Sequence, residues 1–135
     1  DVIVLGSVPS GKMALLYASA DVFAFPSVKE GWGLVLLEAM SAGVPVVSSN
    51  IPPMTEFLGN GENAVLVDPA DYKGLARAIL EVVEDPELAA RLTANGDETA
   101  RFYSWESAAR RHAELYGSIL EERGRGKIER AGSHA

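Results

Sequence analysis

The chain of 135 residues contains no cysteine and only two histidines, His112 and His134. Without cysteine there is no disulfide and no thiolate chemistry, which is typical of a cytoplasmic protein. A histidine-built metal or catalytic centre is not expected, because His112 falls in a polar helical segment and His134 in the C-terminal tail. The chemistry must therefore come from carboxylates and from the backbone.

The sequence also lacks a long apolar run and an excess of positive charge. No run approaches the roughly 20 apolar residues of a membrane-spanning helix, and no secretory leader is evident, so we expect no transmembrane segment. The net charge of −7 and the isoelectric point near 4.8 argue against nucleic-acid binding, because domains that bind the phosphate backbone are usually basic.

Short apolar segments alternate with helical segments along the first half of the chain. We expect strands at 2–5, 22–25, 44–48 and 64–67, helices at 10–20 and 34–42, and a helical turn at 55–58. Gly43 is expected to end the 34–42 helix in the left-handed conformation. Strands that are apolar almost throughout are typical of a parallel sheet with helices on both faces, so the sequence predicts an α/β fold.

The second half of the chain is predicted to be helical. We expect helices at 72–83, from 86 onwards and at 105–121, preceded by the capping residues Asp71, Asp85 and Ser104. The last helix has apolar residues spaced for one buried face. Residues 122–135 are expected to be a charged, glycine-containing and disordered tail, so the predicted domain covers residues 1–121.

Two acids, Glu30 and Glu38, bracket a Gly-x-Gly turn and the start of an apolar helix. A helix that is apolar all round is expected to be buried, so Glu38 needs a partner, either a protein donor or the hydroxyls of a ligand. Gly31 and Gly33 allow the backbone to approach a ligand, and the free N–H groups of a helix start favour an anion. We predict a site for a molecule that carries both phosphate and sugar hydroxyls.

Each of these residues also has a plainer interpretation. Glu30 could be a solvated loop acid beside Lys29, Glu38 could pair with Arg77 or Arg101, and Trp32 could be a core aromatic. The ligand interpretation is favoured because every feature falls where one ligand would need it.

The segment from Gly6 to Lys12 fits the G-x-x-x-x-G-K pattern of a nucleoside triphosphate loop and lies between a predicted strand and a helix. Met13 follows, however, where that loop needs a Ser or Thr hydroxyl for Mg²⁺, and no second strand ends in an acid. We therefore favour an ordinary strand-to-helix turn with Ser10 as the N-cap. A triphosphatase that depends on Lys12 remains an alternative.

Several segments together resemble the retaining glycosyltransferases of family 4, in the nucleotide-sugar-binding C-terminal half of the GT-B fold. The main segment is 25–47, with its two glutamates separated by seven residues, and it is followed by 62–71, 75–79 and 102–106. The resemblance covers residues 1 to 120 or so and implies a Rossmann-like sheet. The family's first two strands, its phosphate-gripping Arg and Lys and its acceptor-binding half have no counterpart here, so we expect a partial domain.

The resemblance implies a role for each residue of the donor site. Glu30 would hold the hydroxyls of the donor sugar as the catalytic residue, and Glu38 would accept hydrogen bonds from the ribose hydroxyls. The other implied donor-binding residues are Val8 and Pro9 near the base, Gly31 and Trp32 in the turn, and the backbone of Gly33, Leu34 and Val35 at the diphosphate. No metal and no other cofactor is expected.

The implied activity is hexosyl transfer from a nucleoside diphosphate sugar to an unknown acceptor, with the chain inactive by itself. The alternative is a non-catalytic binding or structural module of the same fold. We expect either that the strand at 2–5 pairs directly with a neighbour, or that an upstream domain or a second chain completes the sheet. The expected location is cytoplasmic, with a membrane-peripheral full-length enzyme as the alternative.

Overall fold

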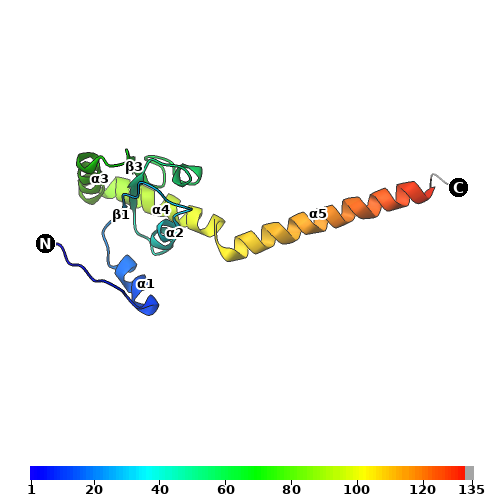
Figure 1. Cartoon of the computed structure of the whole chain (residues 1–135), viewed down its shortest axis with the longest axis horizontal. Coiled ribbons are helices and arrows are strands. Elements are labelled where there is room, and N and C mark those ends of the chain that lie inside the picture. The colour runs from blue at the N-terminus through cyan, green and yellow to red at the C-terminus, as the bar shows by residue number, and fades with distance from the viewer. Residues whose placement is uncertain (133–135) are drawn as a thin grey trace. The chain divides into compact units, whose positions relative to one another are not determined.

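The computed structural model describes residues 1–132, without the side chains of Ser10 and of residues 123–132. Two compact units divide between Arg101 and Phe102. The elements of the first unit are α1 (Ser10–Ala18), β1 (Phe23–Phe25), α2 (Leu34–Ser41), β2 (Val46–Ser49), the 3₁₀ helix η1 (Met54–Glu56), β3 (Val65–Val67), α3 (Tyr72–Glu84) and α4 (Pro86–Phe102), which reaches the boundary (Figure 1). Residues 133–135 of the expected tail lie outside the described residues.

The three strands form one parallel sheet in the order β1-β2-β3. Ala24 of β1 is opposite Val47 of β2, and Ser48 of β2 is opposite Leu66 of β3. This confirms the predicted α/β fold and three of its four predicted strands.

Helices cover both faces of the sheet. Helix α3 contacts β2 and β3, and α2 contacts β1 and β2. Val47 packs in a buried cluster with Val82 of α3 and Leu92 of α4. Its neighbours Val46 and Ser48 point to the opposite face and are also completely buried. The predicted two-sided covering is therefore confirmed.

Most of the predicted helix ends are confirmed by capping bonds. The Asp71 carboxylate accepts a hydrogen bond from the Gly74 N–H at 2.8 Å, and Asp85 accepts one from Leu88 at 3.0 Å. Gly43 has the expected left-handed conformation, with φ of +77°. The N-cap of α1 is different: Pro9 takes that position and Ser10 is already helical, so the predicted Ser10 cap is wrong.

The strand predicted at 2–5 does not form in this chain. Val2, Ile3, Val4 and Leu5 are exposed, and none of them is in a strand. An extended segment needs a neighbouring strand for its backbone hydrogen bonds, and the usual strand order would put this one two positions away from β1. Pairing with a neighbour inside the chain is therefore wrong, whereas completion by another segment stays a prediction.

The second unit consists mainly of helix α5 (Trp105–Gly132). Ser104 caps it as predicted, with its hydroxyl 3.2 Å from the Ser107 N–H. The predicted end near Glu121 is wrong, because the helix continues where a tail was expected; isolated glycines cost a helix only about 1 kcal/mol each. Within this unit the apolar face predicted to be buried is exposed, for example at Leu115 and Tyr116. Across residues 1–132, no helix combines the length and hydropathy that crossing a bilayer requires.

Candidate functional site

Helix α2 begins at a glycine turn with an open N-terminus. Gly33 is its N-cap in the left-handed region, with φ of 79° and ψ of 44°, and no side chain caps the helix. The Leu36 N–H bonds to the Gly33 carbonyl at 2.9 Å. The N–H groups at the start of a helix have no intrahelical acceptor and carry its positive dipole end. The N–H groups of Leu34 and Val35 are therefore suited to an anion.

A cavity of about 290 Å³, which we call the turn cavity, lies at this helix start. It is lined by Phe25, Glu30, Trp32, Gly33, Leu34 and Val35. The Glu30 carboxylate accepts a hydrogen bond from the Gly31 N–H at 2.8 Å, so it is held against its own turn. The Trp32 ring packs on Phe57 at 5.3 Å between centroids, which gives it a structural contact as well as a place in the cavity wall.

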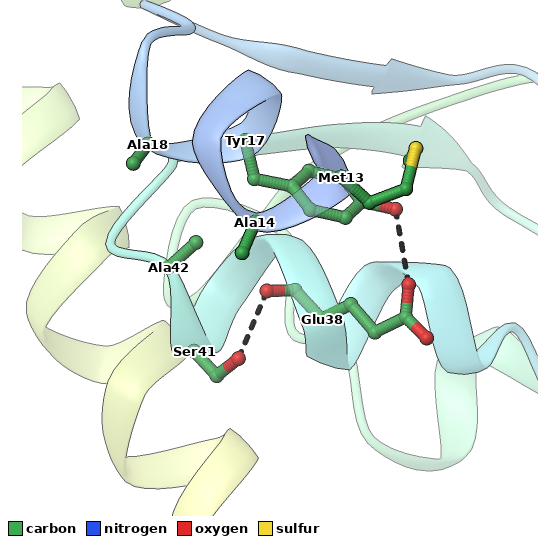
Figure 2. Close-up of a pocket in the computed structure, with 7 residues that line it drawn as sticks. All are labelled: Met13, Ala14, Tyr17, Ala18, Glu38, Ser41 and Ala42. Atoms are coloured by element: carbon green, nitrogen blue, oxygen red, sulfur yellow. Dashed lines mark hydrogen bonds between the residues drawn. The ribbon is translucent and has the colours of Figure 1, made fainter. Parts of the chain in front are cut away.

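A larger cavity of about 540 Å³, which we call the interhelix cavity, lies between α1 and α2. Its lining residues are Met13, Ala14, Tyr17, Ala18, Glu38, Ser41 and Ala42, shown in Figure 2. The Ser41 hydroxyl donates to the main-chain oxygen of Glu38 at 2.9 Å and leaves the carboxylate to other partners. This volume is within the range of small-molecule sites.

The Glu38 carboxylate accepts a hydrogen bond from the Tyr17 hydroxyl, with 3.2 Å between the oxygens (Figure 2). The Tyr17 side chain is buried, and its ring packs edge-on against Phe23 of β1 at 5.4 Å. Burial raises the pKa of the Tyr17 phenol, and the hydrogen bond to Glu38 and the charge of that carboxylate raise it further. A buried tyrosine is thus hydrogen-bonded to an acid in the wall of the interhelix cavity.

The expectation that Glu38 is buried is wrong. Leu34, Glu38 and Ser41 are all exposed, and their spacing puts them on one stripe of α2. The other face of α2 carries its buried residues. Glu38 has the protein donor that was one of the predicted partners, but this donor is a tyrosine. The arginine alternatives do not apply, since Arg77 pairs with Asp71 and Arg101 with Asp97.

The structure brings together only part of the predicted site. The turn cavity gathers Glu30, Trp32, Gly33, Leu34 and Val35, and Gly31 is bonded to Glu30 beside it. Glu38 lines the interhelix cavity instead, one helical turn or about 6 Å along the axis from Leu34.

Val8 and Pro9 line neither cavity. Pro9 is the N-cap of α1, whose residues Met13 and Tyr17 do line the interhelix cavity. A role near a base therefore stays a prediction for both residues. The described side chains also contain no cluster of three or more His, Cys, Asp or Glu residues that could hold a metal ion.

Tyr17 was missed by the sequence reasoning. Its signal is a phenol within an apolar helical segment, since a buried tyrosine hydroxyl usually has a hydrogen-bond partner. Asking for a partner for Tyr17 and for Glu38 together would have suggested the pair. Which side chains meet across two helices depends on their packing, and helical spacing alone does not predict it.

We expect the raised pKa of Tyr17 to make stability fall at alkaline pH. The folded chain holds the phenol proton more tightly than the unfolded chain, whose tyrosine pKa is about 10. This contribution is therefore complete below about pH 10 and is lost as the pH rises through the folded pKa. Urea unfolding across this range should show a steeper fall for the unmodified chain than for Tyr17→Phe. Glu38→Gln keeps Tyr17 buried but removes the negative charge beside it, so the slope of stability against pH for this variant should lie between the other two. Equal slopes for all three chains would contradict this account.

Residues 1–99 match the family described as "Glycosyl transferases group 1". O-antigen chain mannosyltransferase B of Escherichia coli is 38% identical over 112 residues, which cover 83% of this chain and 29% of that protein.

Solved structures of glycosyl-transferring and related enzymes also match this chain. Sucrose-phosphate synthase from Thermosynechococcus elongatus matches with a TM-score of 0.75 and 33% identity, over 87% of this chain and 30% of that chain. Anabaena HepE in complex with UDP-glucose matches with a TM-score of 0.68 and 30% identity, over 76% of this chain and 29% of that chain. The chain thus spans less than a third of the length of each of these proteins.

Proposed function

The chain belongs to the group 1 glycosyl transferases, and from this we propose that it is the donor-binding part of a retaining enzyme of that family. This part binds a nucleoside diphosphate sugar, whose hexosyl group the complete enzyme transfers to an acceptor. The observation that carries the proposal is the arrangement along α2. Glu30 lies with the open helix start in one cavity, and Glu38 lies one turn further on in a second.

The proposed donor is extended along α2. Its sugar occupies the turn cavity with hydroxyls on Glu30, and its ribose lies in the interhelix cavity with hydroxyls on Glu38. The diphosphate between them meets the N–H groups of Leu34 and Val35, where the helix dipole stabilises negative charge. HepE, solved with UDP-glucose, supports a ligand of this chemical class.

The proposed transfer retains the configuration at the anomeric carbon. The bond from that carbon to the leaving phosphate oxygen breaks while the acceptor oxygen bonds on the same face, and the departing phosphate takes the acceptor proton. Glu30 positions the sugar and forms no covalent bond. The helix start stabilises the diphosphate as its charge grows, so we expect no metal requirement.

We expect this chain to bind a donor without transferring its sugar. It spans less than a third of its relatives, and the segment at 2–5 is exposed and unpaired. We propose that a further segment or a second chain completes the sheet beside β1 and supplies the acceptor site.

The test is calorimetric titration of the unmodified chain with uridine diphosphate and UDP-glucose, and with guanosine diphosphate and GDP-mannose. Glu38→Gln should weaken nucleotide and nucleotide sugar alike by about 10- to 100-fold, because hydrogen bonds to a charged group contribute about 1.5–3 kcal/mol. Glu30→Gln should weaken the nucleotide sugar and leave the free nucleotide unchanged.

Glu81→Gln is the matched control, since it neutralises an exposed acid of α3 that lines neither cavity. Its affinities should equal those of the unmodified chain. The proposed donor site would be contradicted if the unmodified chain bound none of the four compounds, which would favour the non-catalytic module. It would also be contradicted if Glu30→Gln and Glu38→Gln affected free nucleotide equally.

A further inference from the structure

We infer that Tyr17 is a positioning residue for the donor site, whose hydroxyl holds the Glu38 carboxylate ready to accept the two ribose hydroxyls. The inference rests on the proposed function and adds to it a residue on a different helix. Tyr17 lies on α1 and Glu38 on α2, so the packing of these two helices sets the geometry of the acid.

The two partners differ in mobility. Tyr17 is only 8% exposed and its ring is fixed edge-on against Phe23, which in turn stacks on Phe25 at 6.1 Å. Glu38 is exposed and has three rotatable side-chain bonds, whose freezing costs conformational entropy. The rigid partner is therefore the tyrosine, and its anchor is strand β1.

The hydrogen bond from Tyr17 leaves the Glu38 carboxylate able to accept hydrogen bonds from a ligand. A carboxylate has about four acceptor positions, of which Tyr17 takes one on Oε2. The remaining positions suffice for the two hydroxyls of a ribose. At 3.2 Å the bond is longer than the usual O–H···O distance, so it restrains the carboxylate without saturating it.

Preorganisation is the physical benefit. A carboxylate that is already restrained loses less rotamer freedom when a ligand binds, and this saving appears as affinity. The raised pKa of Tyr17 agrees with the contact, because burial, the hydrogen bond to Glu38 and the charge of that carboxylate all favour the protonated phenol. Since the benefit passes through Glu38, it should apply only to ligands with ribose hydroxyls.

The test compares uridine diphosphate with its 2′,3′-dideoxy analogue on the 135-residue chain, repeated with the guanosine pair if those nucleotides bind more tightly. Tyr17→Phe keeps the ring and its packing on Phe23 and removes only the hydroxyl. We expect it to weaken the ribonucleotide about fivefold, which corresponds to one ordinary hydrogen bond, and to leave the dideoxy analogue unchanged. In Glu38→Gln, adding Tyr17→Phe should cause little further loss, because the two residues act as one unit.

Tyr72→Phe is the matched control, since it removes a hydroxyl from an exposed tyrosine of α3. It should leave both titrations unchanged. Equal losses for both nucleotides in Tyr17→Phe would mean a structural role and overturn the inference, as would no loss at all; either result leaves the proposed function standing. If the unmodified chain binds neither ribonucleotide, the proposed function fails first and the role of Tyr17 fails with it.

Discussion

Gly33→Ala is expected to lower the free energy of unfolding by about 2–4 kcal/mol, from left-handed strain and overpacking together. Gly33 has φ of +79°, and an alanine Cβ there would lie 2.9 Å from Cδ1 of Leu36. Leu36 is completely buried, so its methyl group has no solvent to move into. The backbone strain and the overpacking therefore both act at the point where the turn enters α2.

Gly31→Ala is the matched control two residues earlier. Apart from its two chain neighbours, no described residue has a heavy atom within 4 Å of its added Cβ, and its φ is not positive, so we expect a change within about 0.5 kcal/mol. Urea unfolding of both variants measures the difference. In a Leu36→Ala background the clash disappears, and the cost of Gly33→Ala should fall to the left-handed term of about 1–2 kcal/mol. Equal effects of the two single variants would contradict this assignment.

Gly31 and Gly33 show how much of the turn the Gly-x-Gly pattern predicts from sequence alone. The Gly-x-Gly pattern predicts a tight turn before an apolar helix, and the turn is there. The pattern treats both glycines alike, however, whereas only Gly33 needs a left-handed backbone and lies against a buried side chain. The requirement comes from the packing of Leu36, which is a tertiary contact.

Local chemistry accounts for what was predicted well. Asp71 and Asp85 cap helices because short acidic side chains reach the free N–H groups of the first turn, and this depends on neighbouring residues alone. Gly43 ends α2 for a similarly local reason. The strands at β1, β2 and β3 were predictable because a parallel sheet covered on both faces requires continuous apolar runs.

The failures at residues 2–5 and at Glu38 have a different cause, since each depends on what lies next to the segment. Residues 2–5 have the composition of a strand but no neighbouring strand among the residues that the structure describes. Glu38 is in an apolar helix, yet its face of α2 borders the interhelix cavity and is only partly covered by α1. The error at α5 is local instead: the helix continues past Glu121 because no strong breaker such as proline stops it.

The kinds of residue in the candidate site could be predicted from the sequence, but their arrangement in space could not. The sequence put Glu30 in the turn before a helix and Glu38 inside that helix, and the structure has both residues in these places, before α2 and on it. Their distribution over two cavities, and the contact of Glu38 with Tyr17, follow from how α1 packs on α2. That packing also makes α2 the part of the fold on which the whole proposal depends.

Leu36→Ala is therefore expected to have the largest effect on the chain, a loss of about 2–5 kcal/mol in the free energy of unfolding. Leu36 is completely buried beneath the turn, and its truncation leaves a cavity under the start of α2. Leu34→Ala, on the same helix but 61% exposed, is the control and should cost less than about 0.5 kcal/mol. Urea unfolding followed by circular dichroism measures both.

The same two variants separate support of the helix from direct contact with a ligand. Leu36 lines neither cavity, so any loss of nucleotide affinity in Leu36→Ala must come from displacement of α2. This displacement moves the N–H groups of Leu34 and Val35 as well as Glu38, so the dideoxyribose nucleotide should also bind more weakly. This is opposite to the ribose-selective loss expected for Tyr17→Phe. A ribose-selective loss in Leu36→Ala, or similar destabilisation by the two leucine variants, would contradict the view that buried packing beneath Gly33 holds α2 in place.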